Sequence, residues 1–248
     1  MPQEYIDLIF THENLIVLGI VFAGGIIRGY TGFGSGLVML PLFSIMWSPV
    51  DAVATTCGLG LFAAGQLAIS SAKYTKWRQV SPMIAALLII TPLGTYLLVS
   101  LDPDIVKKVI AGLVLFVTAI SLRGWHYSGP RGVIPSFIAG SIGAFINGLA
   151  AVGGPAVVLY FLSLPDEVKI QRSNIATIAS LMGIAVFSFT FLSGHVGSDV
   201  WWHILLFAVP YMMATWSGMY LFKRLPGSAF RLIVLWILVA ISIAILLA

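Results

Sequence analysis

The feature that most constrains the fold is a glycine-rich segment, Tyr30-Thr31-Gly32-Phe33-Gly34-Ser35-Gly36, inside a long apolar stretch that runs from Asn14 to Trp47. Each glycine costs roughly 1 kcal/mol relative to alanine in a helix interior. The segment therefore predicts a break in a helix, whose exposed main-chain groups hydrocarbon cannot hydrogen-bond. A second glycine-rich segment, Asn147 to Pro155, interrupts an apolar stretch in the other half of the chain. Two such breaks predict a site.

The composition excludes a water-soluble domain. Apolar residues make up 59% of the chain and charged residues 9%, whereas soluble proteins have about 45–50% and about 25%. All acidic residues fall in the N-terminal segment or between apolar runs, so we expect none in the middle of a span. Membrane orientation explains the net charge of +4 better than nucleic-acid binding does. The single cysteine, Cys57, allows no intramolecular disulfide, and we expect no metal or other cofactor.

The apolar runs predict an all-α integral membrane protein with two over-long units, residues 14–47 and 132–164. A span needs about 20 residues, and the first unit as one helix would be about 50 Å long against about 30 Å of hydrocarbon. Each unit must tilt strongly or fold back as a helical hairpin at its glycine break. The remaining runs predict single spans at residues 52–72, 80–100, 105–122, 173–193, 200–222 and 228–248.

The two halves of the chain resemble each other beyond the breaks. Gly94-Thr95-Tyr96-Leu97 aligns with Gly218-Met219-Tyr220-Leu221, and the apolar runs follow in the same order. A duplication explains this most economically. We expect a first repeat at residues 1–123, a linker at 124–131 and a second repeat at 132–248, each repeat being a hairpin followed by three transmembrane helices.

Lysine and arginine positions decide between single crossings and hairpins for the over-long units. Single crossings divide the basic residues other than Arg28 five against seven, which orients nothing. Hairpins leave only Lys107 and Lys108 on one side and gather ten on the other: Lys73, Lys76, Arg78, Arg123, Arg131, Lys169, Arg172, Lys223, Arg224 and Arg231. The positive-inside rule thus favours hairpins. The repeats are then inverted, with the linker in the cytoplasm and both termini outside.

The helix that restarts after each break predicts an anion site. Ser35 is placed as an N-cap, Pro155 suits a first helical position, and the free N–H groups and positive dipole end of such a start attract anions. Arg28 lies close to the first break and no carboxylate lies within the spans. The residues expected to bind the anion are Arg28, Gly32, Phe33, Gly34, Ser35, Gly36, Thr55, Gly153, Gly154, Pro155, Ser173 and Asn174.

Structural roles for the same residues remain open at this point. The pairs Gly32 with Gly36 and Gly25 with Gly29 also have the spacing that lets membrane helices pack closely without binding anything. Arg28 can pair structurally or reach toward the interface instead of touching substrate. The polar residues Thr55, Thr56, Ser173 and Asn174 can either cap helices or line a pathway.

The motifs carry a family resemblance. Gly32-Phe33-Gly34-Ser35-Gly36-Leu37-Val38-Met39-Leu40-Pro41 near the start and Val152-Gly153-Gly154-Pro155-Ala156-Val157-Val158-Leu159-Tyr160 after the midpoint, in a duplicated chain, resemble the TauE/SafE family of sulfite and sulfonate exporters. The resemblance covers essentially the whole chain. It implies a small sulfur-containing anion, such as sulfite, thiosulfate or a sulfonate, as substrate.

The function expected from the residues and the resemblance is secondary transport, with export of that anion across a bacterial-type cytoplasmic membrane by a multi-pass protein. No nucleotide-binding G-x-x-x-x-G-K-[ST] loop occurs in the sequence. The alternatives are an intramembrane enzyme, such as a lipid phosphate hydrolase, and a non-transporting assembly subunit. The expected partners are the anion and the lipid bilayer, and the sequence leaves open whether the chain forms a homo-oligomer.

Overall fold

The computed structural model describes residues 12–123, 127–222 and 224. The described part of the chain is helical and contains no β-strand, which confirms the predicted all-α class. Its elements are α2 (His12–Thr31), α3 (Ser35–Met46), α4 (Pro49–Ser71), a 3-10 turn η1 (Ala72–Tyr74), α5 (Trp77–Ser100), α6 (Pro103–Leu122), α7 (Val133–Ala150), α8 (Gly154–Leu162), α9 (Val168–Leu192) and α10 (Asp199–Phe222). The predicted span at 228–248 and the predicted cytoplasmic residues Lys223 and Arg231 lie outside the described residues, as do both chain ends and residues 124–126 of the predicted linker.

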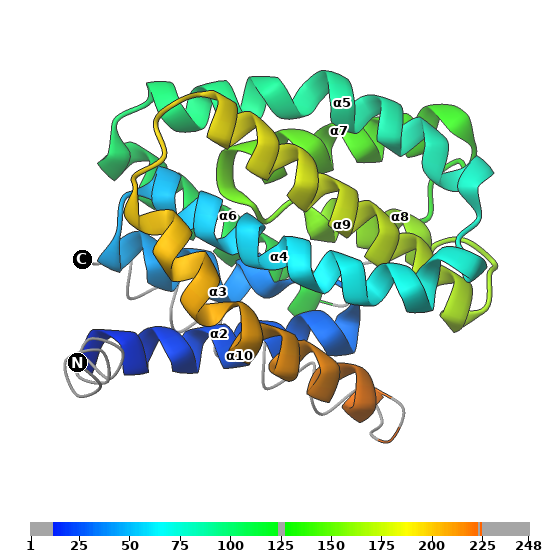
Figure 1. Ribbon diagram of the computed structural model, residues 1–248. Coiled ribbons are helices and arrows are strands. Elements are labelled where there is room, and N and C mark those ends of the chain that lie inside the picture. The colour runs from blue at the N-terminus through cyan, green and yellow to red at the C-terminus, as the bar shows by residue number, and fades with distance from the viewer. Residues whose placement is uncertain (1–11, 124–126, 223, 225–248) are drawn as a thin grey trace.

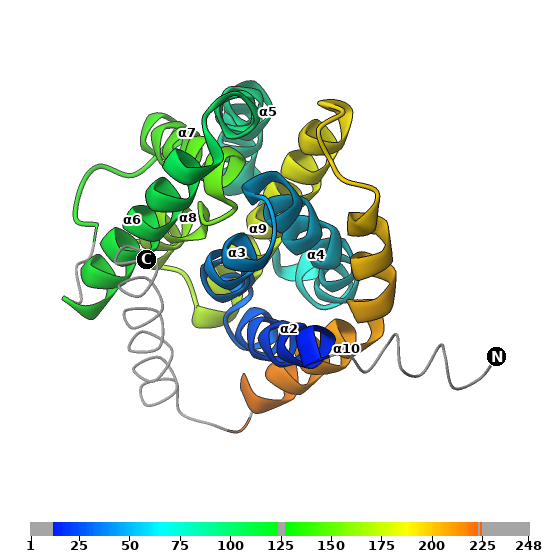
Figure 2. The same cartoon turned by 90° about the vertical axis from the view of Figure 1, so that its left-hand side faces the viewer.

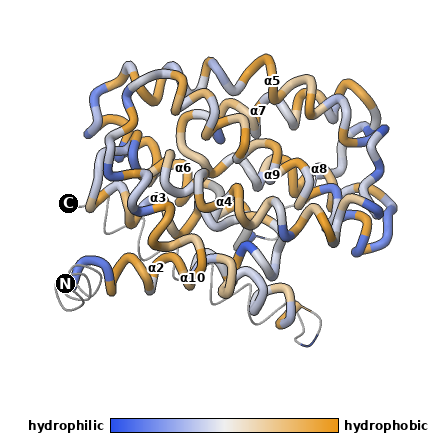
Figure 3. Tube along the Cα trace, viewed as in Figure 1, coloured by the Kyte–Doolittle hydropathy of each residue, from blue (hydrophilic) through white to orange (hydrophobic). Residues whose placement is uncertain are grey.

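Six of these helices, α2, α4, α5, α7, α9 and α10, are long and apolar enough to cross a membrane. They run roughly lengthwise between the two ends of the bundle, and hydrophilic residues gather mainly at those ends (Figures 1 and 3). The chain is therefore a multi-pass membrane protein. By contrast, α3 has 12 residues and α8 has 9, too few to span hydrocarbon alone.

Each short helix turns back along the helix before it, so both over-long units fold back (Figure 1). Trp47, which follows α3, stacks on His203 in the first turns of α10 with ring centroids 4.2 Å apart. The C-terminal part of α8 returns to the start of α7. There the Tyr160 hydroxyl donates to the carbonyl oxygen of Gly132 at 3.0 Å and accepts from the Gly132 N–H at 3.3 Å. The first hairpin thus opens at one end of the bundle and the second at the other.

Close helix pairs hold the two folded-back units in place. Helix α2 packs along α10, and α5 packs along α7 (Figure 2). In the first pair a Cβ atom at Gly29 would collide with the main-chain oxygen of Thr215, and one at Gly218 with that of Ile26. In the second pair a Cβ atom at Gly148 would lie 2.7 Å from the main-chain oxygen of Thr91. Packing is thus the role of Gly29, one of the alternatives that the sequence left open.

The two close pairs correspond to each other under the predicted duplication. Gly94 of α5 meets Gly148 of α7, and Gly218 of α10 meets Gly29 of α2. Gly94 and Gly218 are the residues that align between the halves. Each half thus packs the second helix after its hairpin against the hairpin of the other half. This arrangement agrees with inverted repeats, which remain a prediction.

We predict that Gly218→Ala lowers the melting temperature of the detergent-solubilised protein, because the new methyl group would force α10 away from the Ile26 carbonyl of α2. Overpacking costs typically 1–3 kcal/mol, which corresponds to a shift of several degrees for a chain of this size. Gly112→Ala in α6 is the matched control, because nothing lies within 4 Å of its Cβ position. Equal melting temperatures for the two variants would show that the α2–α10 contact is not tight.

Candidate functional site

The first break is built by two glycines with left-handed backbone conformation. Gly32 has φ 86° and Gly34 has φ 87°, values that side-chain-bearing residues adopt only with strain. The Thr31 hydroxyl donates to the Ile27 carbonyl at 2.8 Å and accepts from the Phe33 N–H at 3.2 Å, which gives a partner to a main-chain group that the break frees. The N-cap of α3 is Gly34, so the prediction that Ser35 caps this helix is wrong. Ser35 is instead its first residue.

The second break is held by a side-chain amide. Ala151, which ends α7, has φ 46° and is the one non-glycine residue with positive φ in the described part of the chain. The Asn147 Oδ1 atom accepts from the Gly153 N–H at 3.2 Å. Helix α8 then starts at Gly154, with Pro155 in its first turn. A main-chain N–H at that place has no acceptor within the helix, so proline, which lacks this N–H, costs no hydrogen bond there.

The structure brings the two breaks into contact. A Cβ atom at Gly36 would collide with the carbonyl oxygen of Ala151, and one at Gly154 would lie 2.7 Å from the Phe33 ring. The Phe33 side chain also packs against both of the larger hydrophobic clusters of the core. The starts of α3 and α8 are therefore neighbours at the centre of the fold.

A cavity of about 40 Å³ lies between the two breaks. Both helix starts line it, together with residues of α2, α4, α7 and α9. Its lining consists of Arg28, Phe33, Gly34, Ser35, Gly36, Leu37, Thr56, Cys57, Gly60, Asn147, Ala151, Val152, Gly154, Pro155, Ala179, Met182 and Gly183. Arg28 is the only charged residue among them.

Arg28 is buried at this cavity, with 7% of its surface exposed. Its Nη2 atom donates to the Ser180 hydroxyl at 3.3 Å, whereas its Nε atom has no hydrogen-bond partner. No carboxylate pairs with it within residues 12–123 and 127–222. Burying an uncompensated charge is costly, so an anion in the cavity would supply the counter-charge that the described residues do not.

Two further polar groups add to the hydrogen-bonding capacity of the cavity. The Thr56 hydroxyl is buried and has no hydrogen-bond partner among the described residues. Asn147 gives its oxygen to Gly153, which leaves its Nδ2 amide as a donor. With Arg28 and the first N–H groups of α3 and α8, the cavity presents donors from five helices, and its described lining contains no carboxylate acceptor.

The sequence-predicted site residues divide into two groups. Those that line the cavity are Arg28, Phe33, Gly34, Ser35, Gly36, Gly154 and Pro155. Those that do not are Gly32, Thr55, Gly153, Ser173 and Asn174. Gly32 instead faces Ala176 of α9, with its Cβ position 3.2 Å from the Ala176 Cβ. Thr55 lies one residue before Thr56, whose side chain reaches the cavity in its place.

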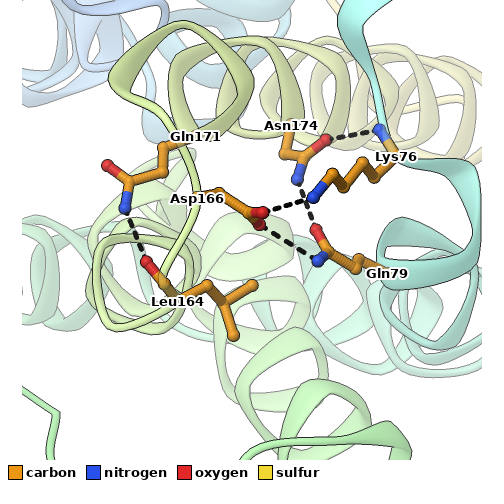
Figure 4. Close-up of polar contacts among 6 residues, drawn as sticks. All are labelled: Lys76, Gln79, Leu164, Asp166, Gln171 and Asn174. Carbon is orange, nitrogen blue, oxygen red and sulfur yellow. Dashed lines mark hydrogen bonds and ion pairs between the residues drawn. The ribbon is translucent and has the colours of Figure 1, made fainter.

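Asn174 belongs to a polar cluster at one end of the bundle (Figure 4). Its Oδ1 accepts from the Lys76 N–H at 2.8 Å, and its Nδ2 donates to Gln79 at 3.0 Å. Lys76 also forms an ion pair with Asp166, which accepts from Gln79 at 3.0 Å. Burial alone would raise the pKa of the Asp166 carboxyl, but the Lys76 and Gln79 hydrogen bonds hold it below its ordinary value. The cluster ties the start of α5 to α9, so Asn174 has a structural role.

Several cavity residues were not among those expected from the sequence to bind the anion. Thr56 and Asn147 are polar residues in apolar runs, and Asn147 opens the second glycine-rich segment, which could have drawn attention to it. Ala179, Met182 and Gly183 of α9 give no chemical signal, and only the fold brings them to the cavity. Cys57 lies at the cavity as a buried free thiol.

Comparison with known proteins adds a family assignment to this geometry. A family model described as "Sulfite exporter TauE/SafE" matches residues 16–245, nearly the whole chain. Neither a comparison with curated proteins nor one with solved structures gave a match.

Proposed function

The chain belongs to the TauE/SafE family, and from this we propose that it is a secondary transporter that carries a small sulfur-containing anion across the cytoplasmic membrane. Sulfite, thiosulfate and small sulfonates are the candidate substrates. The anion binds in the cavity between Gly34-Ser35-Gly36 and Gly154, where α3 and α8 begin. Because the family is a transporter family, no catalytic role is proposed.

The observation that carries this proposal is the buried Arg28 without a carboxylate partner among the described residues, beside two helix N-termini. A guanidinium contributes one positive charge, and each helix start adds the equivalent of about half a charge. The part of the cavity lining that the structure describes therefore carries about two positive charges and no carboxylate. Its volume of about 40 Å³ admits a few water-sized groups, which suits an ion of a few heavy atoms.

The negative charge of the substrate lets the membrane potential drive export without a coupling ion. A membrane potential of about 100 mV, negative inside, is worth roughly 2.3 kcal/mol per charge, and it sustains about a 50-fold gradient of a monoanion. Among the described residues, no Asp or Glu lines the cavity to carry a proton. The proposed mechanism is facilitated diffusion, in which the anion leaves down its electrical gradient.

We predict that Gly34→Val abolishes uptake of labelled sulfite into proteoliposomes while the protein still inserts and stays monodisperse. The Cβ position of Gly34 has space, since its nearest neighbour is Ile27 Cγ2 at 3.5 Å, but its φ of +87° does not suit valine. The cap of α3 would then be distorted at the cavity. Gly19→Val, at a position with nothing within 4 Å, is the matched control and should transport normally.

The same assay tests the charge. Arg28→Ala should raise the apparent substrate constant about 10- to 100-fold, because a hydrogen bond to a charged group is worth about 1.5–3 kcal/mol. Arg78→Ala, at an exposed position, is the control. Normal sulfite uptake by Gly34→Val and Arg28→Ala, or equal uptake of a neutral solute by the wild-type protein, would refute the proposed site.

The orientation proposed from the basic residues has its own test. Lys73, Lys76 and Lys169 lie at the end of the bundle where α4 ends and α9 begins, opposite Lys107 at the start of α6 (Figure 1). We propose that the lysine-rich end is cytoplasmic and that both termini face outside. In a Cys57→Ala background, cysteines at Ser128 and Ser198 should react with an impermeant reagent from opposite sides, Ser198 from outside. Labelling of both from one side would contradict the inverted hairpins.

A further inference from the structure

A second and larger hollow lies at the lysine-rich end of the bundle. It encloses about 800 Å³ where α4 and α10 end and α9 begins. Lys73, Lys169 and Arg172 line it, together with aromatic residues that include Tyr74 and Trp216. Of the described residues in its lining, none is acidic. We refer to this hollow as the basic groove.

Two lysines are held close together in the basic groove by one aromatic ring. The Lys169 Nζ lies 3.7 Å from the centroid of the Tyr74 ring, and the Lys73 Nζ lies 5.0 Å from it. Both ammonium groups, first that of Lys169, lower the pKa of the Tyr74 hydroxyl. The two ammonium groups beside one ring repel each other, and an anion between them would offset that repulsion. The groove thus favours anions.

Arg172, unlike the two lysines, has a structural role at the end of α2. Its guanidinium donates to the carbonyl oxygens of Gly29 at 2.7 Å and Tyr30 at 3.3 Å, at the C-terminus of α2, and it lies 4.3 Å from the Phe222 ring. A cation there compensates the negative end of the helix dipole. Arg172 therefore fixes the end of α2 against α9, immediately before the first break, and leaves Lys73 and Lys169 as the charges available to a ligand.

Helix α9 connects the basic groove to the cavity between the breaks. Arg172 and Ser173 line the groove, whereas Ala179 and Gly183 line the cavity. The seven helical steps from residue 172 to residue 179 rise about 10 Å. Between the two hollows, Ala176 packs against Gly32. A short, closed contact thus separates the groove from the cavity along one helix.

We propose that the basic groove is a vestibule in which small oxyanions bind beside Lys73 and Lys169 before they pass along α9 to the cavity. The passage of the anion from the groove to the cavity rests on the proposed function, whereas its binding in the groove does not. The groove is far larger than the cavity, so it concentrates anions without selecting one closely. Positive potential at such a mouth raises the local anion concentration and the rate of association.

The binding step can be measured without transport, because Trp216 lies in the groove. The Trp216 contribution is the fluorescence that the variant Trp216→Phe lacks relative to the wild type. We expect iodide to quench this contribution more strongly than neutral acrylamide does. The double variant Lys73→Gln/Lys169→Gln should lower the iodide quenching constant several-fold and leave acrylamide quenching unchanged. Lys107→Gln/Lys108→Gln, at the other end of the bundle, is the control and should change neither. Equal iodide quenching in both double variants would overturn the proposal.

Competition distinguishes a free oxyanion from a lipid headgroup. Excess sulfite should protect Trp216 from iodide in phosphatidylglycerol-free detergent micelles. Protection by phosphatidylglycerol but not by sulfite would overturn the proposal in favour of a lipid site.

The transport step is tested by flux of labelled sulfite presented at the lysine-rich end. Lys73→Gln/Lys169→Gln should raise KM at least threefold with kcat unchanged, and the control variant should behave like the wild type. An unchanged KM would refute the vestibule role. If the wild-type protein carries no sulfite, the proposed function fails, and the fluorescence measurement alone still decides whether the groove binds anions.

Discussion

Main-chain N–H and C=O groups that leave a helix inside hydrocarbon must find partners within the protein, and the architecture of this chain depends on how its two helix breaks meet that need. At the first break the Thr31 hydroxyl accepts from the Phe33 N–H. At the second break, the Asn147 Oδ1 atom accepts from the Gly153 N–H. The first N–H groups of α3 and α8 remain, and both helices start at the cavity that also holds Arg28. The groups that the fold leaves over are the ones that an anion would use.

Close packing makes this arrangement rigid. Gly29 and Gly218 let α2 and α10 approach to main-chain contact, and Gly94 and Gly148 do the same for α5 and α7. The hairpins are thereby clamped by helices of the other half, and Phe33 joins the two larger core clusters across the breaks. A site made largely of main-chain groups needs such a frame, because it has few side chains that could adjust to the ligand.

The sequence predicted the position of the breaks well, because glycine-rich segments in hydrocarbon have few structural solutions. It also singled out Arg28, since a charge in an apolar run is costly. The finer assignments depended on helix phase and on tertiary contacts. Gly34 rather than Ser35 caps α3 because the turn requires a positive φ. Thr56 rather than Thr55 reaches the cavity, since neighbouring helical residues differ in direction by about 100°. Ala179 and Gly183 could not be predicted, because small apolar residues carry no signal of the surface that they line.

The claim on which the proposed function depends is that an anion binds between the two helix starts beside Arg28. The most direct measurement is an anomalous diffraction experiment on crystals grown with selenite, a selenium analogue of sulfite. We expect the strongest selenium peak within hydrogen-bond distance of the Arg28 guanidinium and the N–H groups at the starts of α3 and α8. A protein that transports selenite but shows its strongest peak elsewhere would contradict the proposed site.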